Sequence, residues 1–221
     1  KPKTGEWLAS YPELAQTFER YRLTRHIAPT PERRTIVLQP LGELTKEQGL
    51  VLELMREYAE TFFVLPARIA TPLPLPTDPD NDPDKLIRIV PLGQRHGTYD
   101  RQYNAGKILD KVLRPKLPPD AVVCLGITMV DLYEGELNYV FGLGSTLERV
   151  GVYSLCRYYS EFWNRTRQEG DEVKGLVRAC KVLNHETGHM FGLSHCVFYR
   201  CSMNGSNSLV DGKGRLDRAF L

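Results

Sequence analysis

The alternation of apolar and polar residues along the chain predicts a mixed α+β protein. Apolar runs closed by Pro, Gly or polar residues predict strands, at residues 35–42, 61–70, 86–92, 121–128 and 150–159. Apolar residues spaced three and four apart predict helices, at residues 45–58, 104–113 and 171–191. We therefore expect a twisted mixed sheet with backing helices.

The segments between these elements carry their own signals. Thr45 with Gln48 three residues later predicts a capping box at the start of the first helix. Residues 72–84 are rich in Pro and Asp and predict a loop. Residues 137–142 alternate, and the pattern then breaks at Gly142 and Gly144, which favours an exposed edge strand. Residues 1–34 look like an N-terminal extension, and residues 35–221 like one domain.

The helix at 171–191 has two different faces on a helical wheel, with about 100° per residue. Its apolar stripe is expected to face the core and consists of Val173, Leu176, Val177, Cys180, Leu183, Thr187 and Phe191. His185 and His189 fall on the opposite side of the wheel. The pattern thus predicts that the two imidazoles face a cleft.

Residues 185–195 carry the most specific chemistry, the pattern HExxHxxGxxH. His185 and His189 are one helical turn apart and can hold one zinc ion. Gly192 permits a sharp helix exit, so that His195 can supply a third nitrogen. Three protein ligands leave an open position, which is typical of catalytic zinc. Glu186 is suited to act as general base on a zinc-bound water.

Composition limits the alternatives. The chain has 221 residues and a formal net charge of +2, with 42% hydrophobic and 25% charged residues. We therefore expect a globular protein without nucleic-acid or membrane partners. The five cysteines are odd in number, and three lie in apolar surroundings, which favours a reducing, intracellular and cytoplasmic location.

The His motif and the residues that follow it resemble the metzincin zinc endopeptidases, and in particular the archaemetzincin family. In that family a Cys follows the motif at once, then four residues, then Cys-x-Met, and Cys196, Cys201 and Met203 match every position. The likeness extends to Leu38–Gly42, Arg101–Ala105 and Gly126–Tyr133. It implies a zincin-like (metzincin) fold, with an upper lobe at about 35–192 and a short C-terminal lower lobe at 193–221.

The resemblance also implies roles for the residues after His195. Met203 would be the Met-turn residue below the zinc. Cys196 and Cys201 would bind a second, structural zinc together with a later Cys-x-x-Cys pair. That pair would be expected beyond Leu221, so the ligand set and the lower lobe are incomplete in this sequence. A disulfide between Cys196 and Cys201 is the alternative.

These features predict a zinc metallopeptidase with Glu186 as its catalytic residue and His185, His189 and His195 as zinc ligands. By the resemblance, an extended peptide or protein substrate would lie along an edge strand, for which we nominate 137–145. We expect a monomer. Two alternatives stay open: a zinc-binding protein that binds peptides but turns nothing over, and a zinc aminopeptidase. Side-chain preference and the role of residues 1–34 stay open as well.

Overall fold

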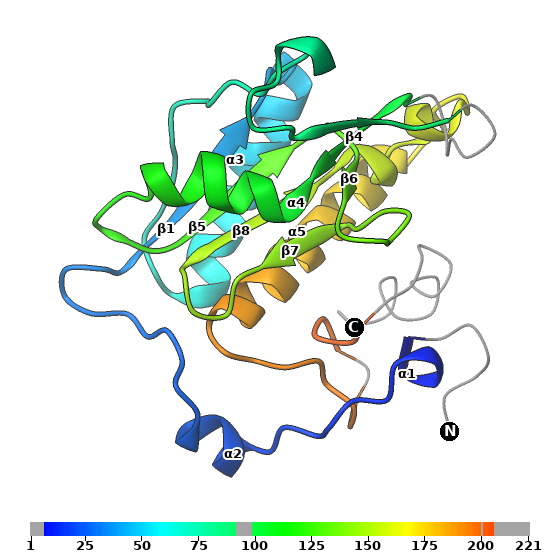
Figure 1. Cartoon of the computed structure of the whole chain (residues 1–221). Helices are drawn as coiled ribbons and strands as arrows, with labels where there is room; N and C mark the ends of the chain where they lie inside the picture. The colour runs from blue at the N-terminus through cyan, green and yellow to red at the C-terminus, as the bar shows by residue number, and fades with distance from the viewer. Residues whose placement is uncertain (1–6, 92–98, 200, 206–221) are drawn as a thin grey trace.

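A five-stranded sheet lies at the centre of the computed structural model, which describes residues 7–91, 99–199 and 201–205 (Figure 1). Its strands, in spatial order, are β2 (Ala67–Ile69), β1 (Thr35–Leu41), β5 (Ala121–Thr128), β8 (Val150–Ser154) and β7 (Gly142–Gly144). The first four strands run parallel, and β7 pairs antiparallel with β8 at one edge. The sheet is therefore mixed, as the sequence predicts.

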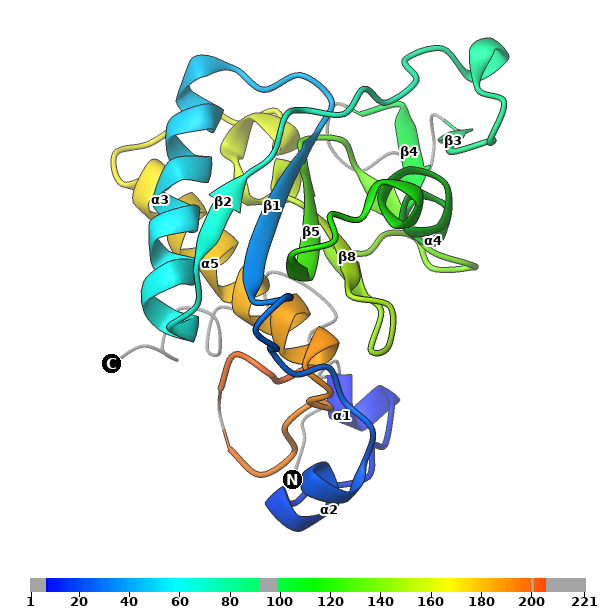
Figure 2. The same ribbon diagram turned by 90° about the vertical axis from the view of Figure 1, so that its left-hand side faces the viewer.

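Helices cover both faces of this sheet (Figure 2). On one face lie α3 (Lys46–Phe63) and α5 (Asp171–Met190), which bury Met55 and Leu183 against strand residues such as Leu125. On the other face lie α4 (Ala105–Lys107) and the π-helical turn that continues it (Ile108–Leu113). The sheet is buried on both sides, which explains why β1 and β5 read as almost continuous apolar runs.

The remaining elements are short. A three-stranded sheet has the order β3 (Ile87–Ile89), β4 (Arg101–Asn104) and β6 (Leu132–Tyr133). Single 3-10 turns occupy Pro79–Asn81, Arg114–Lys116, Cys156–Tyr158 and Ser160–Trp163. The N-terminal part contributes α1 (Trp7–Ser10) and α2 (Phe18–Leu23). No helix among the described residues is long and apolar enough to span a bilayer.

The first predicted helix is confirmed at its start but runs further than its pattern indicated. Thr45 and Gln48 form the predicted capping box. The strand predicted at 61–70 is wrong over its first half, because α3 continues to Phe63 and ends at Val64, which adopts a left-handed conformation with φ 54°. The β-branched and aromatic residues here pack as the last helical turn, where Phe63 meets the ring of Phe191.

Two strand predictions were also too long. The strand predicted at 150–159 ends at Ser154, and Cys156 lies in a 3-10 turn. At 137–145 only Gly142–Gly144 form a strand, β7, so that the two glycines belong to the strand rather than ending it. Glycine permits a close approach of other groups to a strand, and the site explains why both positions need it.

The helix α5 was predicted correctly in place, but its apolar stripe was partly wrong. Val173 and Val177 are 65% and 39% exposed, because the first half of the helix lies at the surface. In the second half the polar side is buried as well, including Lys181 and Glu186. The helix therefore has no simple division into a core face and a cleft face, because chain segments cover its end from several sides.

Candidate metal centre and cleft

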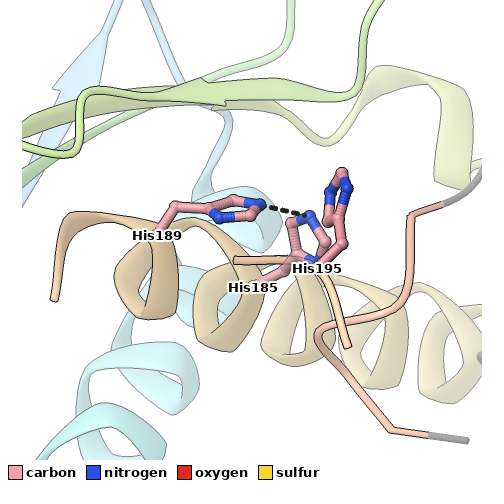
Figure 3. Close-up of side chains that lie close together, drawn as sticks. All are labelled: His185, His189 and His195. Atoms are coloured by element: carbon pink, nitrogen blue, oxygen red, sulfur yellow. Dashed lines mark hydrogen bonds between the residues drawn. The ribbon is translucent and has the colours of Figure 1, made fainter. Parts of the chain in front are cut away.

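Three histidines meet at the C-terminal end of α5 (Figure 3). His185 and His189 lie one turn apart on the helix, and Gly192 then turns the chain with φ +88°. This conformation is open to glycine and brings His195 back over the helix end. Each imidazole offers one ring nitrogen, and these nitrogens lie within 4.8 Å of one another.

The outward nitrogens of the three rings are held by hydrogen-bond acceptors. Nδ1 of His185 lies 2.7 Å from the carbonyl oxygen of Ser202, and Nδ1 of His189 lies 2.7 Å from that of Leu193. Nδ1 of His195 lies 2.7 Å from Oε1 of Glu13. Carbonyl and carboxylate oxygens only accept, so each Nδ1 carries a proton, and in the neutral form of each ring Nε2 keeps a free lone pair.

The electrostatics of the pair on the helix also favour a cation. Burial, and then the neighbouring His189, lower the pKa of His185 to about 3, and burial lowers the pKa of His189. Both rings are thus neutral at pH 7, and their Nε2 atoms lie 3.0 Å apart (Figure 3). Two facing lone pairs repel, and a cation bound by both relieves this repulsion. Three desolvated imidazoles are a donor set that fits Zn²⁺.

Glu186 lies between the helix and the edge strand. The residue is only 6% exposed, and burial raises the pKa of its carboxyl to about 8. A Cβ atom at Gly142 would lie 2.7 Å from Oε1 of Glu186, and one at Gly144 would lie 3.1 Å from Oε2. The two glycines on one face of β7 therefore make the room that this carboxyl occupies.

A cleft of about 550 Å³ runs along these groups. One wall is the segment 137–144, which includes β7, and the floor includes the three histidines, Glu186, Tyr158 and Val182. Trp7 and Tyr11 line it from the N-terminal part of the chain. The predicted edge segment thus lies beside the predicted catalytic residues, although only its last part is a strand.

Buried polar groups fix the start of this wall. Arg157 and Asp131 form an ion pair with both side chains at most 3% exposed, and Nη2 of Arg157 donates to Oδ2 of Asp131 at 2.7 Å. The guanidinium of Arg157 lies 3.7 Å from the ring centroid of Tyr139. Gln102 donates to Asp131 and also to the carbonyl oxygen of Asn138. This network holds residues 138–139 against the second sheet.

The residues after His195 lie below the helix. Met203 is 8% exposed, and its Sδ lies so close to Gly188 that an added Cβ would be 2.5 Å away. Gly188 therefore lets Met203 approach the turn between the two helical histidines. Cys196 and Cys201 are both free thiols in the same loop, and burial is the main cause that raises the pKa of Cys201. Among the described residues, only the three histidines form a cluster of metal-ligand type.

Sequence reasoning missed several groups at the site. Gly142 and Gly144 were interpreted as a strand end, although glycines two apart on a strand can indicate a close neighbour on one face. Tyr158 also lines the cleft, and its buried hydroxyl has no hydrogen-bond partner among the described residues. Glu13, Trp7 and Gln16 gave no signal, because nothing local links them to a motif almost two hundred residues later.

The sequence is similar to members of one known protein family. The sequence model of peptidase family M54 matches residues 79–218. The chain is 33% identical to archaemetzincin-2 of Pongo abelii over 96% of its own length, but it spans 63% of that relative. It is 31% identical to the archaemetzincin of Pyrococcus furiosus, over 81% of this chain and 84% of that one.

The fold is also similar to that of solved structures. The archaemetzincin of Archaeoglobus fulgidus, crystallised with malonate, superposes with a TM-score of 0.58 at 26% sequence identity. The matched region covers 83% of this chain and 91% of the other. The predicted zincin-like fold class is thereby confirmed.

Proposed function

This chain belongs to peptidase family M54, the archaemetzincins, and from that premise we propose that it is a zinc-dependent metallopeptidase. One observation carries the proposal: three imidazoles converge at the end of α5, beside a buried carboxyl and an open cleft. A structure of 22% identity that is described as a zinc-dependent peptidase shares the fold. The function itself rests on the geometry of the site.

His185, His189 and His195 would hold the catalytic zinc through Nε2, because their Nδ1 atoms are engaged elsewhere. When bound, zinc supplies a Lewis acid that makes water a nucleophile near neutral pH and polarises a peptide carbonyl. The chain contributes the rigid placement of the ligands: two on one helix, and the third after a turn that glycine allows.

Glu186 would act as the general base and then the general acid. Its carboxyl, held in the space left by Gly142 and Gly144, accepts a proton from the attacking water and passes it to the leaving amine. Burial raises its pKa while no cation is near, and a cation at the three histidines would lower it again. The same carboxyl can therefore take up and release one proton within a catalytic cycle.

An extended peptide would bind along β7. Residues Phe141 and Ser145 on either side form hydrogen bonds toward β8, so the alternation of an antiparallel ladder turns the main-chain groups of Gly142 and Gly144 toward the cleft. Hydrogen bonds to the main chain of a substrate do not depend on its side chains, so such pairing binds peptides of many sequences. Apolar side chains in the cleft, such as Phe141 and Val182, would favour hydrophobic substrate residues near the cleavage site.

We assign two supporting roles to the loop after His195. Met203 would form the apolar floor of the metal centre, since it packs under the turn that carries His185 and His189. Cys196 and Cys201 would hold a second, structural zinc with ligands from outside the described residues. Their free thiols support this over a disulfide and fit the intracellular, cytoplasmic location that we expect. We also propose that the protein is a monomer.

The test is hydrolysis of a mixed peptide library by zinc-loaded protein, with cleavage sites identified by mass spectrometry. Internal cleavage, also in peptides with a blocked amino terminus, is the expected result. Cleavage of free amino termini alone would make the protein an aminopeptidase. Stoichiometric zinc and peptide binding without any cleavage would make it a binding protein and contradict the proposed activity.

A further inference from the structure

The N-terminal segment Trp7–His26 is bound to the loop that carries His195. Gln16 donates to the carbonyl oxygen of Gly192 at 2.9 Å and accepts from the backbone N–H of Ser194 at 3.0 Å. The hydroxyl of Tyr21 donates to the carbonyl oxygen of Phe191. These contacts fasten both sides of the turn from which His195 emerges.

Two glycines let the segment approach this closely. A Cβ at Gly192 would lie 2.6 Å from the Cβ of His26. A Cβ at Gly205 would collide with the indole ring of Trp7. The N-terminal segment is therefore closely packed against the loop on both sides of His195. The contact is not limited to the ends of long side chains.

At the centre of this contact is Glu13. Its Oε1 accepts from Nε1 of Trp7 and from Nδ1 of His195, both at 2.7 Å. The side chains of Glu13 and His195 are 25% and 18% exposed, and Oε2 of Glu13 is buried without a partner among the described residues. A partly buried carboxylate with an unpaired oxygen is costly unless positive charge lies near.

Resting on the proposed function, we propose that Glu13 is a positioning residue for His195 and that the N-terminal segment is part of the metal centre. The Glu13 carboxylate fixes the Nδ1–H tautomer and the ring plane of His195, and thereby aims Nε2 at the point where His185 and His189 converge. Metal-bound histidines are commonly held in this way by a carboxylate, which also makes the ring a stronger donor.

The hydrogen bond from Nδ1 of His195 differs in its partner from those of the other two histidines. His185 and His189 donate to backbone carbonyl groups 17 and 4 residues away in the chain. His195 donates to a side chain 182 residues away. Only for His195 can a single side-chain substitution remove the partner, and only there does the partner carry a charge that balances a bound cation.

The experiment compares zinc affinity, measured by competition with a chromophoric chelator, in four variants of the full chain: Glu13→Ala, Glu13→Gln, His195→Ala and Glu32→Ala. Glu32 lies in the exposed part of the same extension and is the matched control. Glu13→Ala should weaken zinc binding by about 10- to 100-fold. Glu13→Gln should lose less, because the amide oxygen still accepts from Nδ1–H, and Glu32→Ala should equal the wild type.

A second readout separates positioning from mere folding. The visible absorption spectrum of the Co²⁺-loaded protein reports the ligand geometry, and Glu13→Ala should shift it toward the spectrum of His195→Ala. Gln16→Ala removes a neighbouring tether but keeps the Glu13 contact, and its spectrum should stay closer to that of the wild type than to that of Glu13→Ala. Equal affinity and spectrum in Glu13→Ala and Glu32→Ala overturn the role of Glu13, as does an equal loss in Gln16→Ala.

The zinc affinities test the role of Glu13 independently of peptide cleavage. If the wild type binds zinc but cleaves nothing, the proposed activity fails while the affinities still decide the role of Glu13. If His195→Ala binds zinc as tightly as the wild type, the third ligand is wrong and both proposals fall together.

Discussion

The two halves of the metal centre are held in place by different forces. His185 and His189 belong to α5, whose neighbouring residues Leu183 and Met190 are fully buried against the sheet. His195 lies in a loop without regular structure, and polar contacts with the N-terminal segment fix it. Apolar packing thus places two of the proposed ligands, while a few hydrogen bonds place the third.

This difference predicts that the histidines on α5 are held more rigidly than His195 in the loop. Buried apolar contacts are many and individually weak, so the helical pair stays in place whether or not a metal is bound. Hydrogen bonds at a partly exposed surface contribute only about 0.5–1.5 kcal/mol each. The loop half is therefore where metal binding and the N-terminal segment depend on each other, and the following predictions test this division.

The largest effect on activity is expected for Glu186, the buried carboxyl on α5. Glu186→Ala should lower kcat/KM for peptide cleavage by about 10²- to 10⁴-fold, because the proton acceptor is lost. Zinc content should stay that of the wild type, because Glu186 is not a ligand. Elemental mass spectrometry and a peptide assay measure both quantities, and full activity in this variant would remove Glu186 from the mechanism.

Truncation of a leucine to alanine should destabilise the protein much more in α5 than in the loop that follows it. Leu183→Ala deletes a fully buried side chain of α5 and should lower the free energy of unfolding by about 2–5 kcal/mol. Leu193→Ala removes a side chain that is 37% exposed in the loop and should cost about 1 kcal/mol or less. Denaturant unfolding of the two variants measures the contrast. Equal losses would show that the loop is packed as firmly as the helix.

The buried carboxyl predicts a pH dependence of the metal-free protein. Its pKa of about 8 lies above the ordinary value of 4.5, so the folded state binds this proton more tightly than the unfolded state. The resulting stability is complete below pH 4.5 and is lost as the pH rises through about 8. In the presence of chelator, Glu186→Gln should therefore have a higher Tm than the wild type above pH 8. Parallel Tm profiles for the two proteins would refute the buried, uncompensated carboxyl.

The smallest effect on stability is expected for Gln16, a single residue that links the N-terminal segment to the loop. Gln16→Ala breaks two hydrogen bonds to the loop and should lower the free energy of unfolding by about 1 kcal/mol. Its effect on proteolysis should be larger, because the N-terminal segment opens more often. Limited trypsin digestion, which can cut after Arg20 or Arg22, measures this opening. Unchanged digestion would mean that other contacts hold the segment.

The same division explains what the sequence could predict. The place of α5, the capping box at Thr45 and the buried strands β1 and β5 follow from local periodicity and local chemistry. The motif with His185 and His189 could be interpreted because helical spacing alone brings its residues together. Gly192 likewise predicted the sharp exit, and its φ of +88° confirms it.

What failed depends on contacts between distant parts of the chain. The last turn of α3 resembled a strand because Phe62, Phe63 and Val64 are typical of strands, whereas Phe63 is in fact helical and contacts the distant ring of Phe191. Val177 fits the apolar stripe, but its side chain lies at the surface and is 39% exposed. Glu13 was invisible because the residue it serves lies at the other end of the sequence.

The central claim is that the three histidines hold a zinc ion on which peptide cleavage depends. The most direct measurement is peptide hydrolysis and zinc content per chain, before chelation, after it, and after stepwise return of zinc. The account predicts that activity disappears with the zinc and returns in proportion to it, and that neither returns to His185→Ala. Cleavage that persists in zinc-free protein, or in His185→Ala, would contradict the account.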